Sequence, residues 1–125
     1  MKYTVDKQER FTLFALNEKT LNSTIAPDLK SELVILQNEG VQSLILDLSN
    51  VHYIDSSGLS SILTGHRIWK GDAAFLLTGL QPAVEKLIHV SQLHNILSIM
   101  PNIDDALAFI KEIDDEEAAA ISDDK

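Results

Sequence analysis

The 125-residue chain contains no cysteine, which excludes disulfides, thiol catalysis and any cysteine-ligated zinc or iron–sulfur site. It also has no apolar run approaching the roughly 20 residues of a membrane-spanning helix. Its N-terminus, MKYTVDKQERF, carries charges where a signal peptide would place its apolar stretch. The lack of a membrane-spanning run and of a signal peptide predicts a cytoplasmic protein without membrane insertion.

Basic residues are few, because 10 Lys and Arg stand against 19 Asp and Glu, for a formal net charge of -9. Seven of these acids lie in residues 112–125, and the preceding residues hold twelve acids and nine bases. Without a basic stripe to neutralise phosphates, the chain is not expected to bind nucleic acid. The acidic end either binds a basic partner or is a solvated, partly frayed tail, and we predict a tail without an assigned function.

The motifs of common catalytic sites are also missing. The sequence has neither a P-loop nor a G-x-G-x-x-G pattern, and no spacing typical of metal ligands, so no cofactor or metal is expected. A nucleophile elbow, G-x-S-x-G, would need glycine where Ile54 precedes Ser56 by two residues. His66 would lie about 15 Å along a helix from Ser56, too far to act as its base. We expect no catalytic residue, and a serine hydrolase is kept only as an alternative.

Hydrophobic residues make up 45% of the chain, enough for one domain with a core. Alternation over residues 3–17 predicts a hairpin, and residues 43–50, apolar on both faces, predict a central strand. Helical periodicity and turn residues place helices at 25–40, 57–70, 80–92 and 102–113, with strands at 72–80 and 94–100. This order predicts a single α/β domain with a mixed β-sheet of about five strands, four helices and right-handed crossovers.

The stretch YIDSSGLSSIL, residues 53–63, marks the change from a strand to a helix. Helix N-termini carry unpaired N–H groups and a partial positive charge, so they attract anions. Asp55, Ser56 or Ser57 could satisfy these donors as a cap, or one hydroxyl could be a chemical handle. Gly58 allows another backbone to approach closely. The residues alone leave both interpretations open.

Several motifs together resemble the STAS domain of bacterial anti-sigma factor antagonists. They are the strand LILDLSNVHYI ending in DSSGL, a helix start with Gly79, Pro82, Val84 and Leu87, and the closing ALAFI. The similarity runs from about Tyr3 to Ile113. It implies a STAS-like fold, with a STAS domain over residues 1–113 and an acidic C-terminal tail over 114–125.

The resemblance also implies a mechanism. A partner anti-sigma factor that is a serine kinase would phosphorylate Ser56, and a serine phosphatase would remove the phosphate. The unphosphorylated form would bind the kinase and release a sigma factor. The partner-binding residues implied by the motif are Asn22, Asp55, Ser56, Ser57, Gly58 and Leu59. Asn22 stands where family antagonists often have aspartate, and Ser60 where they often have glycine.

One alternative keeps the fold but changes the function. The protein would be a constitutive STAS adaptor subunit of another complex, such as a lipid-transport ATPase, with Ser56 only a cap. Tyr53, Ile25 and Leu59 beside the turn, and Trp69 late in its helix, are candidate contact residues of a docking surface. For Leu59 and Trp69 we predict core packing instead, since large apolar side chains usually cover a sheet.

Overall fold

A computed structural model describes residues 1–123, with side chains described through residue 119. The elements are β1 (Tyr3–Lys7), β2 (Thr12–Leu16), β3 (Thr20–Leu21), α1 (Ala26–Asn38), β4 (Ser43–Asp47), β5 (Tyr53–Ile54), α2 (Ser56–Ile68), β6 (Ala74–Thr78), α3 (Pro82–Val90), the short 3-10 helix η1 (Leu93–Asn95), β7 (Ser98–Met100) and α4 (Ile103–Asp123). The four α-helices and the predicted order of the long strands are confirmed.

The main sheet has five strands in the order β1-β2-β4-β6-β7. β1 pairs with β2 antiparallel, whereas β2, β4, β6 and β7 pair in parallel. Parallel neighbours require a crossover, and α1, α2 and α3 supply the three that are needed. The mixed sheet predicted from the sequence is therefore confirmed, with β4 at its centre.

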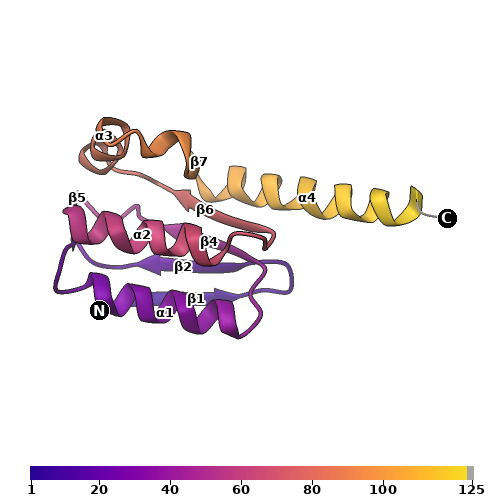
Figure 1. The fold of residues 1–125 in the computed structure, drawn as a ribbon, viewed down its shortest axis with the longest axis horizontal. Helices are drawn as coiled ribbons and strands as arrows, with labels where there is room; N and C mark the ends of the chain where they lie inside the picture. Colours follow the sequence, from indigo (N-terminus) through magenta and orange to yellow (C-terminus); the bar gives the residue numbers. More distant parts are fainter. Residues whose placement is uncertain (124–125) are drawn as a thin grey trace.

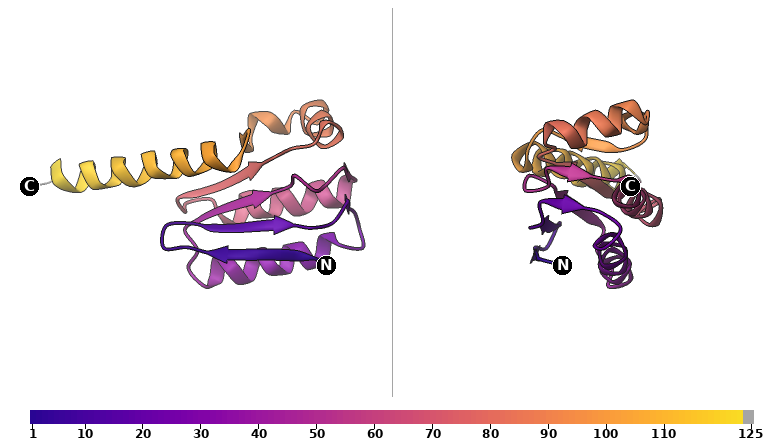
Figure 2. Two further views of the ribbon diagram at one scale, coloured as in Figure 1. Left: turned by 180° about the vertical axis from the view of Figure 1, so that it is seen from behind. Right: turned by 90° about the vertical axis from the view of Figure 1, so that its left-hand side faces the viewer.

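Helices cover the sheet on both faces. Along β4, Leu44 and Leu46 pack with α1, α2 and α3 in one core cluster, while Ile45 packs on the other face with Ala106 and Ile110 of α4. α1 and α2 lie side by side on the same face of the sheet, and both begin at the same end of its strands (Figure 1). Seen from behind, no helix lies over β1 and β2 (Figure 2). The apolar character of β4 on both faces thus follows from its central place.

Two local expectations were wrong, and one small sheet was missed. Residues 94–100 do not form one strand, because η1 takes up the first part and only Ser98–Met100 pairs with β6. The last helix does not end near Ile113 but continues to Asp123. Alanine and glutamate are good helix formers, which accounts for a helix through this acidic segment. The sequence analysis also missed β3 and β5, which form a separate two-stranded sheet.

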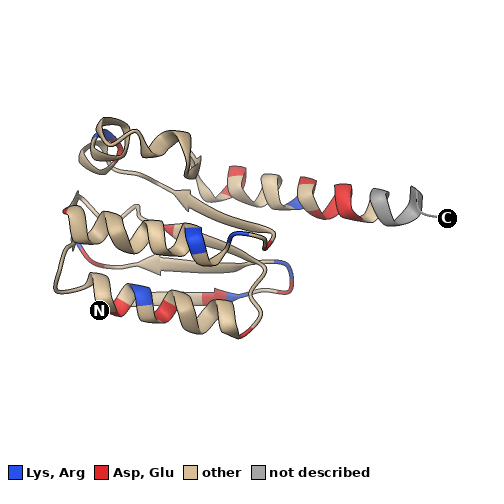
Figure 3. Cartoon of the chain, viewed as in Figure 1, with Lys and Arg blue, Asp and Glu red and all other residues tan. Residues whose placement is uncertain are grey.

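Acidic residues recur along the described turns of α4, whereas lysines and arginines are scattered over the fold (Figure 3). In the described part of the chain, no helix is both long and apolar enough to span a bilayer.

Candidate functional site

The short sheet of β3 and β5 builds the site. These strands pair in parallel, with Thr20 opposite Tyr53 and Leu21 opposite Ile54. The backbone N–H of Asp55 donates to the carbonyl of Leu21 at 3.2 Å, which extends the pairing by one step. The chain segments that lead into α1 and α2 are thereby held next to each other.

Asp55 is the cap of α2. Its Oδ1 accepts a hydrogen bond from the Gly58 N–H at 2.8 Å, and its extended backbone is typical of an N-cap. Its Oδ2 accepts a second hydrogen bond from the Ser23 N–H at 3.3 Å. One carboxylate therefore fixes the first turn of α2 and also ties it to the loop before α1.

Ser56 is the first residue of α2, and its side chain is exposed. Within the described residues, its hydroxyl makes no hydrogen bond, and neither does the hydroxyl of the half-buried Ser57. The first turn of α2 contains no acidic residue, so its partial positive charge is met only by Asp55 at the cap. The structure thus separates the two roles that the sequence left open, because Asp55 caps the helix and the Ser56 hydroxyl stays accessible.

Gly58 is needed for the close approach of two backbones. A Cβ atom placed on it would collide with the Leu21 carbonyl oxygen and would come within 2.7 Å of Ile54 Cγ1. Since the Leu21 carbonyl also accepts the Asp55 N–H, a side chain at position 58 would disturb the pairing that brings the two helix starts together. This confirms that a backbone approaches the glycine, as its position in the turn suggested.

The other predicted residues divide between the surface and the core. Asn22 is half-buried and lies in the loop before α1, where its Oδ1 accepts the Thr24 N–H at 3.0 Å. Leu59 is 9% exposed and belongs to the core, so its part in partner binding stays a prediction. Tyr53, by contrast, is 66% exposed and lies close to Ser56 in the sequence.

Trp69 packs inside the domain, as predicted. It is 3% exposed, stacks on Phe75 with ring centroids 5.6 Å apart, and donates its indole N–H to the Val41 carbonyl at 3.1 Å. Ile25 packs against the main core cluster and is half-buried. Neither residue is a surface anchor of the kind that dominates interface energetics.

A hollow of about 250 Å³ opens between the first turns of α1 and α2. The side chains that line it include Ala26, Pro27 and Lys30 from α1, with Ser56, Ser57 and Ser60 from α2. Among the described residues, no histidine and no carboxylate lines this hollow, and both oxygens of the neighbouring Asp55 already accept backbone N–H groups, so the hydroxyl of Ser56 has no free general base there. The arrangement therefore lacks a component that a serine hydrolase needs.

Lys30 and Ser23, which also line the hollow, were not among the predicted partner-binding residues. Lys30 and Ser23 lie more than 25 residues before Ser56, so no local motif connects them with it. Only the parallel crossovers, which start α1 and α2 at the same end of the strands, could have indicated that Lys30 and Ser23 lie near Ser56.

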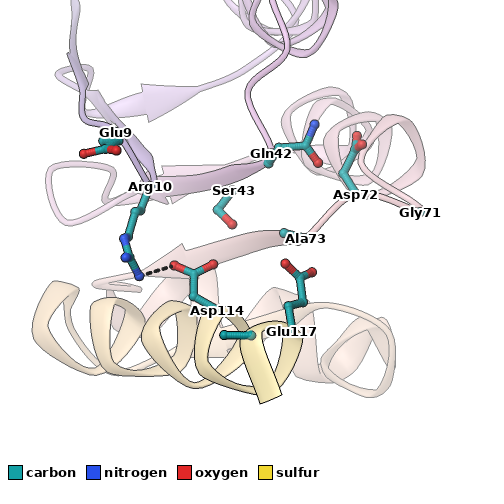
Figure 4. A pocket seen from close by; sticks show the side chains of 10 residues that line it. Glu9, Arg10, Gln42, Ser43, Gly71, Asp72, Ala73, Asp114 and Glu117 are labelled. Atoms are coloured by element: carbon teal, nitrogen blue, oxygen red, sulfur yellow. Dashed lines mark hydrogen bonds and ion pairs between the residues drawn. The ribbon is translucent and has the colours of Figure 1, made fainter. Parts of the chain in front are cut away.

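A larger hollow, of about 540 Å³, lies at the opposite end of the strands, where β4 and β6 begin (Figure 4). Arg10 and the acids Glu9, Asp72, Asp114 and Glu117 line much of it, and Arg10 pairs with Asp114 at 3.3 Å. None of the predicted site residues lines it. Over the described residues, no group of three His, Cys, Asp or Glu side chains is arranged to hold a metal ion.

Comparisons with known proteins agree with this geometry. A family model described as the STAS domain matches residues 2–106. A Bordetella bronchiseptica protein named as an anti-sigma factor antagonist, BtrV, is 31% identical over 102 residues, which cover 81% of this chain and 84% of that protein.

Solved structures show the same fold. The crystal structure of an anti-sigma factor antagonist from Mycobacterium paratuberculosis has a TM-score of 0.80 at 21% identity, covering 88% of this chain and 93% of that one. The antagonist SpoIIAA, solved in its unphosphorylated form, has a TM-score of 0.74 at 17% identity, covering 89% and 97%. With a family model over most of its length and a relative of this similarity, the chain belongs to the STAS domain family, among the bacterial anti-sigma factor antagonists.

Proposed function

We propose that this protein is an anti-sigma factor antagonist controlled by phosphorylation of Ser56. In its unphosphorylated form it binds an anti-sigma factor that is also a serine kinase, and this binding releases a sigma factor in the cytoplasm. A serine phosphatase returns phosphorylated Ser56 to the hydroxyl form. The protein performs no catalysis of its own in this cycle, and we assign the switch to residues 1–113 and not to the acidic segment 114–125.

The observation that carries the proposal is the state of Ser56. Its side chain is exposed at the start of α2 and free of hydrogen bonds in the described structure, because the carboxylate of Asp55 already caps the helix. A hydroxyl that the fold does not use can be modified without loss of the fold. The name of the Bordetella relative, and the unphosphorylated form named for SpoIIAA, support the same assignment.

The chemistry is a phosphoryl transfer made by the partner. A bond forms between Ser56 Oγ and the γ-phosphorus of a nucleoside triphosphate, the bond to the diphosphate breaks, and the hydroxyl proton passes to a base on the kinase. The product carries about -1.5 to -2 charges at neutral pH. The N-terminus of α2 tolerates this charge, whereas an interface that fits a neutral hydroxyl would have to bury an unpaired dianion.

The test combines site mapping with binding. The protein is isolated from its native cells with phosphatases inhibited, in growing and in stressed cultures, and its phosphorylated residues are mapped. We expect phosphate on Ser56 with an occupancy that changes between the two conditions. If Ser56 stays unmodified in both while the protein co-purifies with a membrane transporter or another stable complex, the adaptor function replaces this proposal.

Binding of the purified anti-sigma kinase to variants gives the second readout. Ser56→Ala should bind like the unmodified protein, and Ser56→Asp should bind at least about a hundredfold more weakly, which corresponds to about 2.7 kcal/mol. Ser31→Asp, which adds the same charge on the exposed side of α1, is the matched control and should bind normally. Equal binding by Ser56→Ala and Ser56→Asp would contradict the switch.

A further inference from the structure

The hollow beside Ser56 contains one cationic side chain. Its lining combines the first turns of two neighbouring helices, and Lys30 is the ionisable residue among the lining side chains. At about 250 Å³ it has several times the roughly 30 Å³ that one water molecule occupies in the liquid. A phosphoryl group attached to Ser56 Oγ therefore has room beside the helix start without displacing either helix.

Lys30 has no ionic partner in the described part of the structure, although the chain is strongly acidic. In this respect Lys30 resembles most lysines of the described structure, in which Lys7 pairs with Glu39 at 3.0 Å and Arg10 with Asp114 at 3.3 Å. Asp55 is the nearest carboxylate in the α2 turn, and both of its oxygens already accept backbone N–H groups. Lys30 lines the hollow and is half-buried, and partial burial reduces the screening of a charge by solvent.

We propose that Lys30 is a positioning residue that holds the phosphoryl group of phosphorylated Ser56 in the hollow between α1 and α2. This inference rests on the proposed function, because it concerns the phosphorylated form of the same serine. The ammonium group supplies the opposite charge, and the hydroxyls of Ser57 and Ser60 line the same space as possible donors. A lysine suits this role because its flexible stem lets a compact charge follow the phosphate.

A contact with Lys30 would change the surface that both the kinase and the phosphatase meet. A phosphate held against α1 covers the groove between the two helix starts as well as the modified serine. The phosphoserine is also kept as a dianion at neutral pH, since a nearby cation favours the more negative form. Lys30 from α1 is the ionisable residue that lines the hollow, and Asp55 precedes Ser56 at the cap of α2, so their charges act on that of the phosphate in opposite directions.

The experiment uses the full chain with phosphoserine inserted at position 56 during translation, so no kinase is required. The second pKa of the phosphoserine is measured by ³¹P NMR in the unsubstituted chain, in Lys30→Gln and in Lys30→Arg. We expect Lys30→Gln to raise this pKa by about 0.5 to 1 unit, the size expected for one charge at close range in partly screened surroundings, and Lys30→Arg to leave it low.

Lys70→Gln is the matched control. It removes the same charge from the exposed end beyond α2, about 20 Å along the helix from Ser56, where screening by salt is nearly complete. This variant should leave the phosphoserine pKa unchanged. Equal values in the unsubstituted chain and in Lys30→Gln, or equal rises in Lys30→Gln and Lys70→Gln, would overturn the inference.

A second measurement needs no substitution and so does not depend on how the variants fold. The ¹³Cε resonance of Lys30 is compared in the chains with serine and with phosphoserine at position 56, and a shift at Lys30 without one at Lys70 is expected. An unchanged Lys30 resonance would contradict the contact. Because phosphoserine is installed without a kinase, this outcome leaves the proposed function standing, whereas an unmodified Ser56 in native cells removes the proposed function alone.

Discussion

The two helix starts that form the site are held in different ways. At α1, the backbone carbonyl of Asn22 accepts the N–H groups of Ile25 and Ala26, at 3.0 and 2.8 Å, and no side chain caps the helix. At α2, the carboxylate of Asp55 is the cap and also bonds to the Ser23 N–H. The start of α1 is thus a turn closed by its own backbone, whereas the start of α2 depends on one charged side chain.

This difference determines which groups are available for chemistry. A serine at an N-cap normally uses its hydroxyl to accept a helix N–H. Here the aspartate does this one residue earlier, so the serine at the first helical position keeps its hydroxyl free. The capping residue and the modifiable residue are neighbours with separate tasks, and variants of each should therefore affect different properties.

The largest effect on stability is expected from Gly58→Ala. At an open helical position this change stabilises a protein by about 1 kcal/mol. Here the new methyl group meets the Leu21 carbonyl oxygen, a backbone atom that cannot rotate away, and we expect a loss of roughly 1–3 kcal/mol. Urea unfolding measures it, with Ser57→Ala as the control at the neighbouring position. Stabilisation by Gly58→Ala would mean that the two helix starts are not tightly coupled.

Asp55→Ala should have the next largest effect, about 1–2 kcal/mol, because it removes the cap and the bond to Ser23 together. Asp55→Asn should lose less, since its one carbonyl oxygen can still accept the Gly58 N–H but not both bonds. The same unfolding series compares the two variants. If Asp55→Asn lost no stability, the second bond to Ser23 would carry none of the coupling between α1 and α2.

The sequence predicted the cap of α2 better than it predicted which residues lie next to each other at the site. Short apolar runs located β4 and β6, helical periodicity located α2, and the turn from Asp55 to Gly58 was recognised as a helix start. The pairing of Leu21 with Ile54 was not predictable in this way, because two-residue strands carry no periodic pattern. Lys30 was missed for a different reason, because its position beside Ser56 depends on how two crossovers place their helices.

Asn22→Ala should cost less than Asp55→Ala, about 0.5–1 kcal/mol. It removes one local hydrogen bond to the Thr24 N–H at 3.0 Å, while the two backbone bonds to the Asn22 carbonyl remain. Thermal and urea unfolding of both variants give the ranking. A loss as large as that of Asp55→Ala would show that α1 also depends on a side chain, and the contrast between the two helix starts would disappear.

The smallest effect is expected from Ser56→Ala, within about 0.5 kcal/mol of the unsubstituted protein, because the side chain is exposed and unbonded in the described structure. Ser61→Ala is the matched control in the same helix. Ser61 is fully buried and donates to the Gly58 carbonyl at 2.6 Å, so losing its hydroxyl should cost about 1 kcal/mol. A large loss for Ser56→Ala would assign the serine a structural task after all. A stability-neutral Ser56→Ala would instead mean that any change in its binding or modification arises from the chemistry of the hydroxyl and not from unfolding of α2.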